Sequence, residues 1–204
     1  VINAIASVGT GVWLAYTGPI VPAFGDDSID STWIYNNGQY GNYQIIWQET
    51  NSICIDSDTI DVSFFEQPIA YAGNNDSICG NQAIMNAVAS VGDGVWTSTS
   101  SAGTANFAFP DADDSPVNVS DFGIYTFTWK ETNAICSDSA NIYYGFFEQP
   151  TANAGLGGDT CGLRFPLEAI PSVTGSTGNW YKFSGTGTAS FAPENSNVSV
   201  AEVD

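Results

Sequence analysis

Two clusters of aspartate are the residues of this sequence best suited to chemistry. Each cluster follows a short apolar segment, which ends at Phe24 in one case and at Phe107 in the other. Hard oxygen ligands at alternate positions suit Ca²⁺, although neither cluster has the full loop pattern of a helix-flanked calcium site. No cofactor is required, and Ca²⁺ is the ion that these loops would hold, with a solvated acidic loop as the alternative. The six candidate ligands are Asp26, Asp27, Asp30, Asp111, Asp113 and Asp114.

The four cysteines form two sets at one spacing, because Cys136 follows Cys54 by 82 residues and Cys161 follows Cys79 by 82 residues. Two positioned cysteines in a small unit favour an oxidising compartment outside the cytoplasm. We expect a Cys79–Cys136 disulfide, which would close a loop of about 57 residues and stabilise the unit by roughly 4 kcal/mol. Cys54 and Cys161 would then pair outside residues 1–204. Buried free thiols are the alternative, and zinc is disfavoured because histidine and a Cys-x-x-Cys pair are absent.

Catalytic side chains cannot be assembled from this sequence. It has no histidine, no Cys-His pair and no Gly-x-Ser-x-Gly turn, so no activated nucleophile is predicted. Carboxylates are abundant, but glycosidase chemistry needs two of them across a cleft, and a small sandwich offers little cleft. We therefore expect that the chain is not an enzyme.

The charge balance restricts the partners. The formal net charge is −19, from 22 acidic and 3 basic residues. Such a surface repels the phosphates of nucleic acids and of anionic lipids, so neither is an expected partner. No apolar run approaches the ~20 residues needed to cross a bilayer, so direct membrane insertion is not expected. The acidic surface suits a protein that is soluble outside the cell.

The sequence repeats itself. Phe64–Pro68 recurs as Phe146–Pro150, and Asn3–Trp13 recurs as Asn86–Trp96. Tandem copies of one unit are typical of arrays. We predict a partial repeat over residues 1–68 without its first strand, a complete repeat over 69–150, and a partial repeat over 151–204 without its last strands. The two ends are expected to be those of a window cut from a longer array.

Each repeat is predicted to be a β-sandwich. Short alternating apolar runs, such as Ile124–Trp129, are separated by Gly, Asn, Asp and Ser. A turn is expected at Glu131–Asn133, and the last long strand at Ser139–Phe147. The fold class is therefore all-β, with tandem immunoglobulin-like sandwich repeats of about 82 residues in a linear array.

One motif supports the immunoglobulin-like fold. Asp121, Gly123 and Tyr125 match a tyrosine corner, in which the phenol hydrogen-bonds back to the backbone. The first copy keeps Gly41 and Tyr43 but lacks the aspartate. A tryptophan early in each copy is expected in the core, with a sugar-binding platform as the alternative. These tryptophans are Trp13, Trp96 and Trp180.

The order of motifs resembles a known class of repeat. Gly92–Trp96, Gly123–Asn133, Cys136–Ser139 and Phe146–Gly155 together resemble tandem repeats in very long cell-surface proteins of the Bacteroidota. Those repeats are similar to polycystic-kidney-disease-type modules and occur in SprB-type gliding-motility adhesins exported by the type IX secretion system. The resemblance implies extracellular filaments that contact surfaces or polysaccharide, with no catalytic residues.

The same resemblance implies O-glycosylation, because Bacteroidota modify Asp-Ser or Asp-Thr followed by a small or aliphatic residue. An unmodified chain is the alternative, since an Asp- and Ser-rich sequence contains such matches by chance. The candidate acceptors are Ser28, Ser31, Thr59, Ser77 and Ser139.

The function expected from the sequence is structural and adhesive. The chain would be part of a surface fibre acting in attachment or gliding, located outside the cell. Its partners would be neighbouring repeats of the same chain, surface polysaccharide, or other copies in a fibre. The alternatives are a polysaccharide-binding module and a passive spacer of a secreted enzyme.

Overall fold

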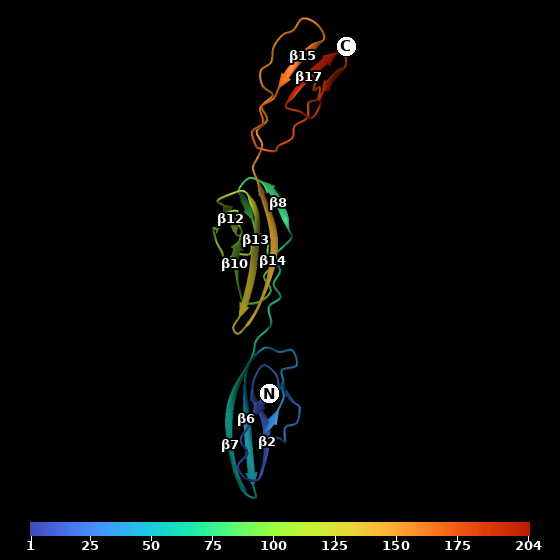
Figure 1. Cartoon of the computed structure of the whole chain (residues 1–204). Coiled ribbons are helices and arrows are strands. Elements are labelled where there is room, and N and C mark those ends of the chain that lie inside the picture. Colours follow the sequence, from blue (N-terminus) through green and yellow to red (C-terminus); the bar gives the residue numbers. More distant parts are fainter.

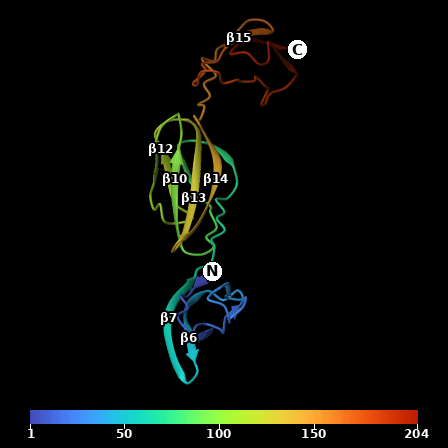
Figure 2. The same cartoon turned by 60° about the horizontal axis from the view of Figure 1, so that its bottom comes forward.

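A computed structural model describes all 204 residues, and its strands form three groups that follow one another along the chain (Figure 1). The view in Figure 2, turned by 60°, shows the same succession of three groups. All 17 elements are strands, which confirms the predicted all-β class. No helix of a length and apolarity able to span a membrane is present.

The middle group is a two-layer sandwich. One sheet has the strand order β10-β13-β14-β8 and the other has the order β11-β12-β9. In immunoglobulin lettering, β10, β13 and β14 are strands C, F and G, and β11, β12 and β9 are strands D, E and B. The additional strand β8 pairs in parallel with β14, the last strand. The strands are β8 (Asp76–Cys79), β9 (Gln82–Ile84), β10 (Asp93–Thr99), β11 (Ala105–Phe107), β12 (Pro116–Val119), β13 (Gly123–Asn133) and β14 (Cys136–Phe147).

Aromatic side chains fill the core of this unit. Successive residues of β13 face opposite sides of the sheet, so Tyr125, Phe127 and Trp129 all point inward and are at most 1% exposed. They meet the valines of β12 from the other sheet. Trp96 of β10 lies 5.2 Å from Trp129 between ring centroids. The alternation predicted over Ile124–Trp129 is therefore the one that builds the core.

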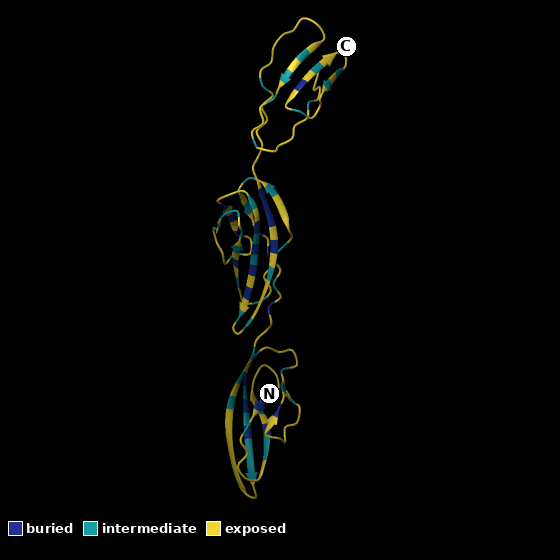
Figure 3. Cartoon of the chain, viewed as in Figure 1, coloured by how far each residue is buried: buried dark blue, intermediate teal, exposed yellow.

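The first group repeats this plan over residues 2–64 with a smaller core. Its sheets have the orders β2-β6-β7, β1-β4 and β3-β5. Five residues form the core, and β7 has no outer partner of the kind that β8 gives to β14. Figure 3 shows the result, because β7 is mostly exposed. The strands are β1 (Ile2–Asn3), β2 (Thr10–Thr17), β3 (Ala23–Phe24), β4 (Ser31–Thr32), β5 (Ile34–Tyr35), β6 (Gly41–Asn51) and β7 (Cys54–Phe64).

The third group is a single sheet with the order β15-β17-β16. Its strands are β15 (Arg164–Glu168), β16 (Ala189–Ala192) and β17 (Val198–Val203). Residues 65–75 and 148–163 connect the groups and belong to no strand, although Tyr71 bridges Val88 and Ala72 is buried in the core of the middle unit. The predicted boundaries 1–68, 69–150 and 151–204 and the repeat length stay predictions.

The prediction of a Cys79–Cys136 disulfide is wrong. β8 pairs with the last residues of β14, and the register places Cys79 beside Phe147. Cys136 is the first residue of β14, eleven residues before Phe147. At a rise of about 3.3 Å per residue, the two cysteines lie at opposite ends of a strand roughly 36 Å long. All four cysteines are free in this structure.

The predicted turn at Glu131–Asn133 also needs correction. These three residues continue β13 and pair with the first residues of β14. The chain reverses instead at Ala134, whose φ of 53° is in the left-handed region. The last strand consequently begins at Cys136 rather than at Ser139.

The Gly-x-Gly-x-Trp motif is explained by two close approaches. Gly92 has a φ of +84° and lies against the backbone of Thr132. Gly94 lies under the indole of Trp129, and a Cβ added there would fall within the ring. Gly9 and Gly11 lie in the same way against Thr50 and Trp47 of the first unit.

We expect Gly94→Ala to destabilise the middle unit by about 1–3 kcal/mol, because the ring or the strand must move. Amide hydrogen exchange in β10 and β13 measures the loss as a lower free energy of opening. The matched control is Gly157→Ala, where an added Cβ meets nothing within 4 Å. Equal exchange protection in Gly94→Ala and the unmodified chain would contradict this packing.

Candidate functional site

A buried carboxylate lies where the linker between the first two units meets the middle unit. Glu131 follows Trp129 on the inward face of β13 and is 1% exposed. Its oxygens accept a hydrogen bond from the Ser90 amide at 3.1 Å and one from the Trp129 Nε1 at 2.8 Å. The Ser90 hydroxyl donates a further, short hydrogen bond. A buried charge is costly unless such donors satisfy it, and here they do.

The same serine holds the linker. The Ile69 amide donates to the Ser90 Oγ at 2.9 Å, so a linker N–H, a hydroxyl and the buried carboxylate form one chain of hydrogen bonds. Hydrogen bonds in such a chain polarise and strengthen one another. The linker is in this way fixed at Ile69 to the core of the unit that follows it.

Three more hydrogen bonds hold the linker along the β13–β14 hairpin. The Asn133 Nδ2 donates to the carbonyl of Glu66, and the Gln67 Nε2 donates to the carbonyl of Ser137, both at 2.9 Å. The Ala70 amide donates to the Asp138 Oδ2, also at 2.9 Å. Since donors and acceptors on both sides are used, the linker lies against the hairpin instead of running freely between units.

Parts of this network recur in the other units. In the first unit, the Ser7 amide and the Trp47 Nε1 donate to Glu49 at 3.0 and 2.9 Å. In the third, the Thr151 amide donates to the Ser172 Oγ at 2.8 Å, which repeats the bond between Ile69 and Ser90. Both linkers therefore meet the following unit through the same contact.

The hydrogen bonds favour the ionised form of both glutamates. Burial raises the pKa of Glu131, but the hydrogen bonds from Ser90 and Trp129 outweigh it and bring the pKa below the ordinary 4.5. In the first unit, the hydrogen bonds from Ser7 and then from the matching tryptophan lower the pKa of Glu49 to about 2.

The acidic loops contact the core through backbone carbonyls that accept hydrogen bonds from the early tryptophan of each unit. In each unit one loop carbonyl accepts the backbone N–H of the early tryptophan, and another carbonyl, two or three residues later, accepts its indole N–H. The loop is thereby tied around the ring. The acceptors are Asp27 and Ile29 for Trp13, Pro110 and Asp113 for Trp96, and Glu194 and Ser196 for Trp180, at 2.7–3.3 Å.

The candidate Ca²⁺ ligands are all exposed. No group of three Asp, Glu, Cys or His side chains is placed to hold a metal ion. Asp26 instead accepts hydrogen bonds from the hydroxyl and amide of Ser28, which lower its pKa. Calcium binding stays a prediction. The same holds for the other five candidate Ca²⁺ ligands, which are Asp27, Asp30, Asp111, Asp113 and Asp114.

The residues of the predicted tyrosine corner come together. The Tyr125 hydroxyl donates to the carbonyl of Asp121 at 2.8 Å, and Gly123 has a φ of +151° between them. Tyr43 makes the same bond to Gln39, so the corner does not need the aspartate side chain. The Asp121 carboxylate accepts from the Ser120 hydroxyl instead.

All five candidate O-glycosylation residues are exposed. The hydroxyls of Ser28 and Ser31 donate to Asp26 and Asn3. Their modification stays a prediction, as it does for Thr59, Ser77 and Ser139.

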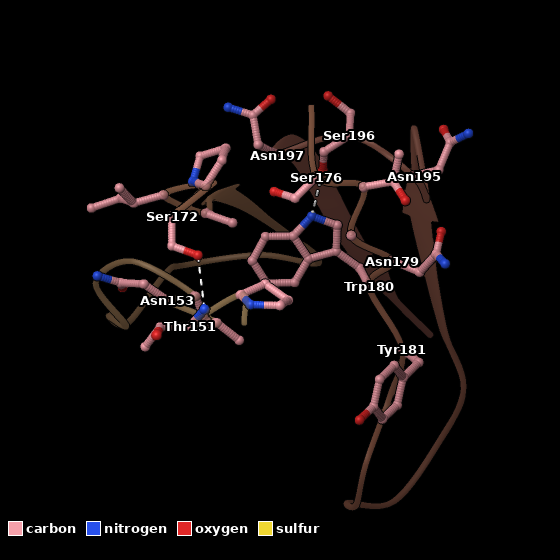
Figure 4. A pocket seen from close by; sticks show the side chains of 18 residues that line it. Thr151, Asn153, Ser172, Ser176, Asn179, Trp180, Tyr181, Asn195, Ser196 and Asn197 are labelled. Atoms are coloured by element: carbon pink, nitrogen blue, oxygen red, sulfur yellow. Dashed lines mark hydrogen bonds between the residues drawn. The ribbon is translucent and has the colours of Figure 1, made fainter. Parts of the chain in front are cut away.

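A cavity of about 650 Å³ lies beside Trp180 in the third unit. Figure 4 shows the indole between the Ser172 segment and the Ser196–Asn197 segment. In the middle unit the corresponding ring, Trp96, packs on Trp129. The cavity therefore lies beside a half-buried tryptophan, whereas Trp13 and Trp96 are buried.

The sequence analysis missed the role of the Ser90–Glu131–Trp129 network. A signal was present, because the Trp-x-Glu pair of Trp47 and Glu49 recurs 82 residues later and the serine recurs with it. A glutamate in the predicted turn at Glu131–Asn133 is expected to be exposed, where its carboxylate needs no protein partner.

Comparison with known proteins gives structural similarities only. No family model and no curated protein matches the chain. Domains 4 and 5 of the S-layer protein SbsC align with 67% of this chain and 70% of that one, at 13% identity and a TM-score of 0.29. Mouse protocadherin-24 EC1-3 aligns with 98% of this chain and 79% of that one, at 10% identity and a TM-score of 0.38.

Zebrafish RET cadherin-like domains 1 to 4 align with 96% of this chain at 9% identity and a TM-score of 0.24. This chain spans 57% of that structure. All three TM-scores are below 0.5, so the assignment of an immunoglobulin-like fold rests on the strand order of the middle unit.

We expect Glu131→Gln to cost the middle unit about 1–3 kcal/mol at pH 7, because the amide NH₂ would face the donors on Ser90. The folded-state pKa of Glu131 is below its unfolded value, so its stabilisation is fully present above a pH of about 4.5 and is lost as the pH falls through the folded-state pKa. Denaturation between pH 7 and 2 should therefore show a flatter pH dependence for the variant.

The control for this titration is Glu148→Gln, since Glu148 is exposed and its carboxylate makes no hydrogen bond. An unchanged slope in Glu131→Gln, or the same change in both variants, would show that the buried carboxylate is not the group responsible.

Proposed function

We propose that this chain is a rod-forming segment of an extracellular surface protein, in which consecutive units are joined at a fixed angle. The observation that supports this most directly is the hydrogen-bond chain from the Ile69 amide through Ser90 to Glu131. A linker with its polar groups satisfied by the next unit resists bending more than a free one.

The composition of the linker supports the same proposal. Pro68 and Pro150 restrict the backbone at the same place in both linkers. The side chains of Gln67 and Gln149 both reach the carbonyl of the following proline, at 3.5 and 3.4 Å. Two linkers with the same local contacts would give two similar junctions, as a regular rod requires.

The surface suits exposure to water in a crowded fibre. The net charge of −19 is carried almost entirely by exposed carboxylates, and it would keep neighbouring rods apart. The resemblance to SprB-type adhesins suggests the finer proposal that the rod belongs to a cell-surface adhesin acting in attachment or gliding.

A polysaccharide-binding module is less well supported. Tyr16, Tyr35 and Tyr181 are exposed, as such a module needs. They lie in β2, in β5 and outside any strand, respectively, so they do not recur at one place of the unit. A row of stacking platforms along the array would need such recurrence.

We expect Ser90→Ala to loosen the first junction while leaving both units folded, because it removes the acceptor for the linker amide but keeps the residue 90 backbone amide and the Trp129 indole as donors to Glu131. In ¹⁵N relaxation, the first and middle units should share one rotational correlation time in the unmodified chain and show shorter, separate values in the variant. Ser139→Ala is the control, since the exposed Ser139 makes no side-chain hydrogen bond. Separate correlation times already in the unmodified chain would contradict the proposed rod.

A further inference from the structure

Two of the four free cysteines lie at opposite ends of the middle unit. Cys79 ends β8 beside Phe147, and the amide of the next residue, Gly80, donates to the carbonyl of Phe147 at 2.8 Å. This is the end from which the chain leaves for the third unit (Figure 1). Cys79 is exposed there.

Cys136 lies at the opposite end, beside the linker that arrives from the first unit. Its thiol contacts the carbonyl of Phe65, with 3.9 Å between the Sγ and the oxygen. The neighbouring Asn133 side chain holds the carbonyl of Glu66. The hairpin cysteine of one unit thus touches the residue that directly follows the last strand of the unit before it.

Phe65 and Phe147 are the same position of the repeat. Both are the second phenylalanine of Phe-Phe-Glu-Gln-Pro. The linkers that follow them make matching contacts, because Ile69 donates to Ser90 and Thr151 donates to Ser172. The groups found around the Phe65 carbonyl are therefore also expected around the Phe147 carbonyl, and the reverse.

If both sets of contacts occur at one junction, two cysteines lie beside the same carbonyl. At the Phe147 carbonyl, the Cα of Cys79 is within about 5 Å, since it is about 2.4 Å from the Gly80 nitrogen that donates there. A following unit with its own hairpin would bring its counterpart of Cys136 to the same oxygen, as Cys136 is brought to Phe65. The Cys79 Cα and the counterpart's Sγ would then lie about 5 Å and 3.9 Å from one oxygen, which allows the Cα–Cα separation of less than roughly 7 Å that a disulfide needs.

We propose that consecutive units are joined by a disulfide across each junction, from the β8 cysteine of one unit to the hairpin cysteine of the next. The proposal rests on the proposed tandem rod. It uses each of the two cysteines of a unit once.

The reaction is thiol–disulfide exchange with a low-molecular-weight disulfide such as oxidised glutathione. One thiolate attacks the donor and releases one reduced thiol. The thiolate of the second cysteine then attacks this mixed disulfide and displaces the second low-molecular-weight thiol. Two protons and two electrons leave the protein, and the donor disulfide becomes two thiols. The product is a covalent link parallel to the hydrogen-bonded linker.

Two extended forms of the full chain test this proposal. In the first, a copy of residues 69–83 precedes Val1, which aligns with Ile84 in the repeat, so that the first unit gains a β8 strand and its cysteine. In the second, a copy of residues 121–150 follows Asp204, so that the third unit gains its last two strands and a hairpin cysteine. Each is oxidised with glutathione and mapped by non-reducing mass spectrometry.

The expected products are a bond from the added cysteine to Cys136 in the first form and from the added cysteine to Cys79 in the second. Cys136→Ser and Cys79→Ser, respectively, should abolish these links. Cys54→Ser and Cys161→Ser are the matched controls and should leave both links in place.

The proposal is overturned if neither form yields its cross-junction link, or if the added cysteines pair preferentially with Cys54 or Cys161. The rod itself is tested separately by ¹⁵N relaxation of the same two proteins under reducing conditions. Units that tumble together but remain unlinked after oxidation would reject the disulfide and keep the rod.

Discussion

The middle unit and its junction with the first depend on one buried charge. Glu131 lies on the inward face of β13, where a carboxylate without donors would oppose folding. Its cost is offset only when Ser90 and Trp129 both donate to it, and the Ser90 hydroxyl can also hold the linker. The folding of the unit and the position of the chain that enters it are in this way coupled. A neutral residue at this place could fill the space without fixing the linker.

The aromatic core and the junction share the same residues. Trp129 packs on Trp96, covers Gly94 and donates its indole N–H to Glu131. A motif that looks purely like core packing in the sequence thus also positions the polar network. The equivalent glycine, tryptophan and glutamate of the first unit are Gly11, Trp47 and Glu49, in the same relationship.

The sequence predicted what depends on local pattern. Alternation over Ile124–Trp129 identified the inward face of β13, and the spacing of Asp121 and Tyr125 identified the residues of the corner bond. It failed where the answer depends on which elements meet. The parallel pairing of β8 with the end of β14 decides where Cys79 lies, and residue spacing carries no information about that pairing. The same is true of Glu131, whose role follows from a serine 41 residues away.

The central claim is that the first and middle units behave as one rigid body because the linker is bonded to the core of the second. Residual dipolar couplings of backbone amides in β6, β7, β13 and β14 of the unmodified chain measure this directly. The account predicts that one alignment tensor fits both units with equal magnitude. Two tensors of clearly different magnitude would contradict it, because they would mean that the units reorient independently despite the Ile69–Ser90–Glu131 hydrogen bonds.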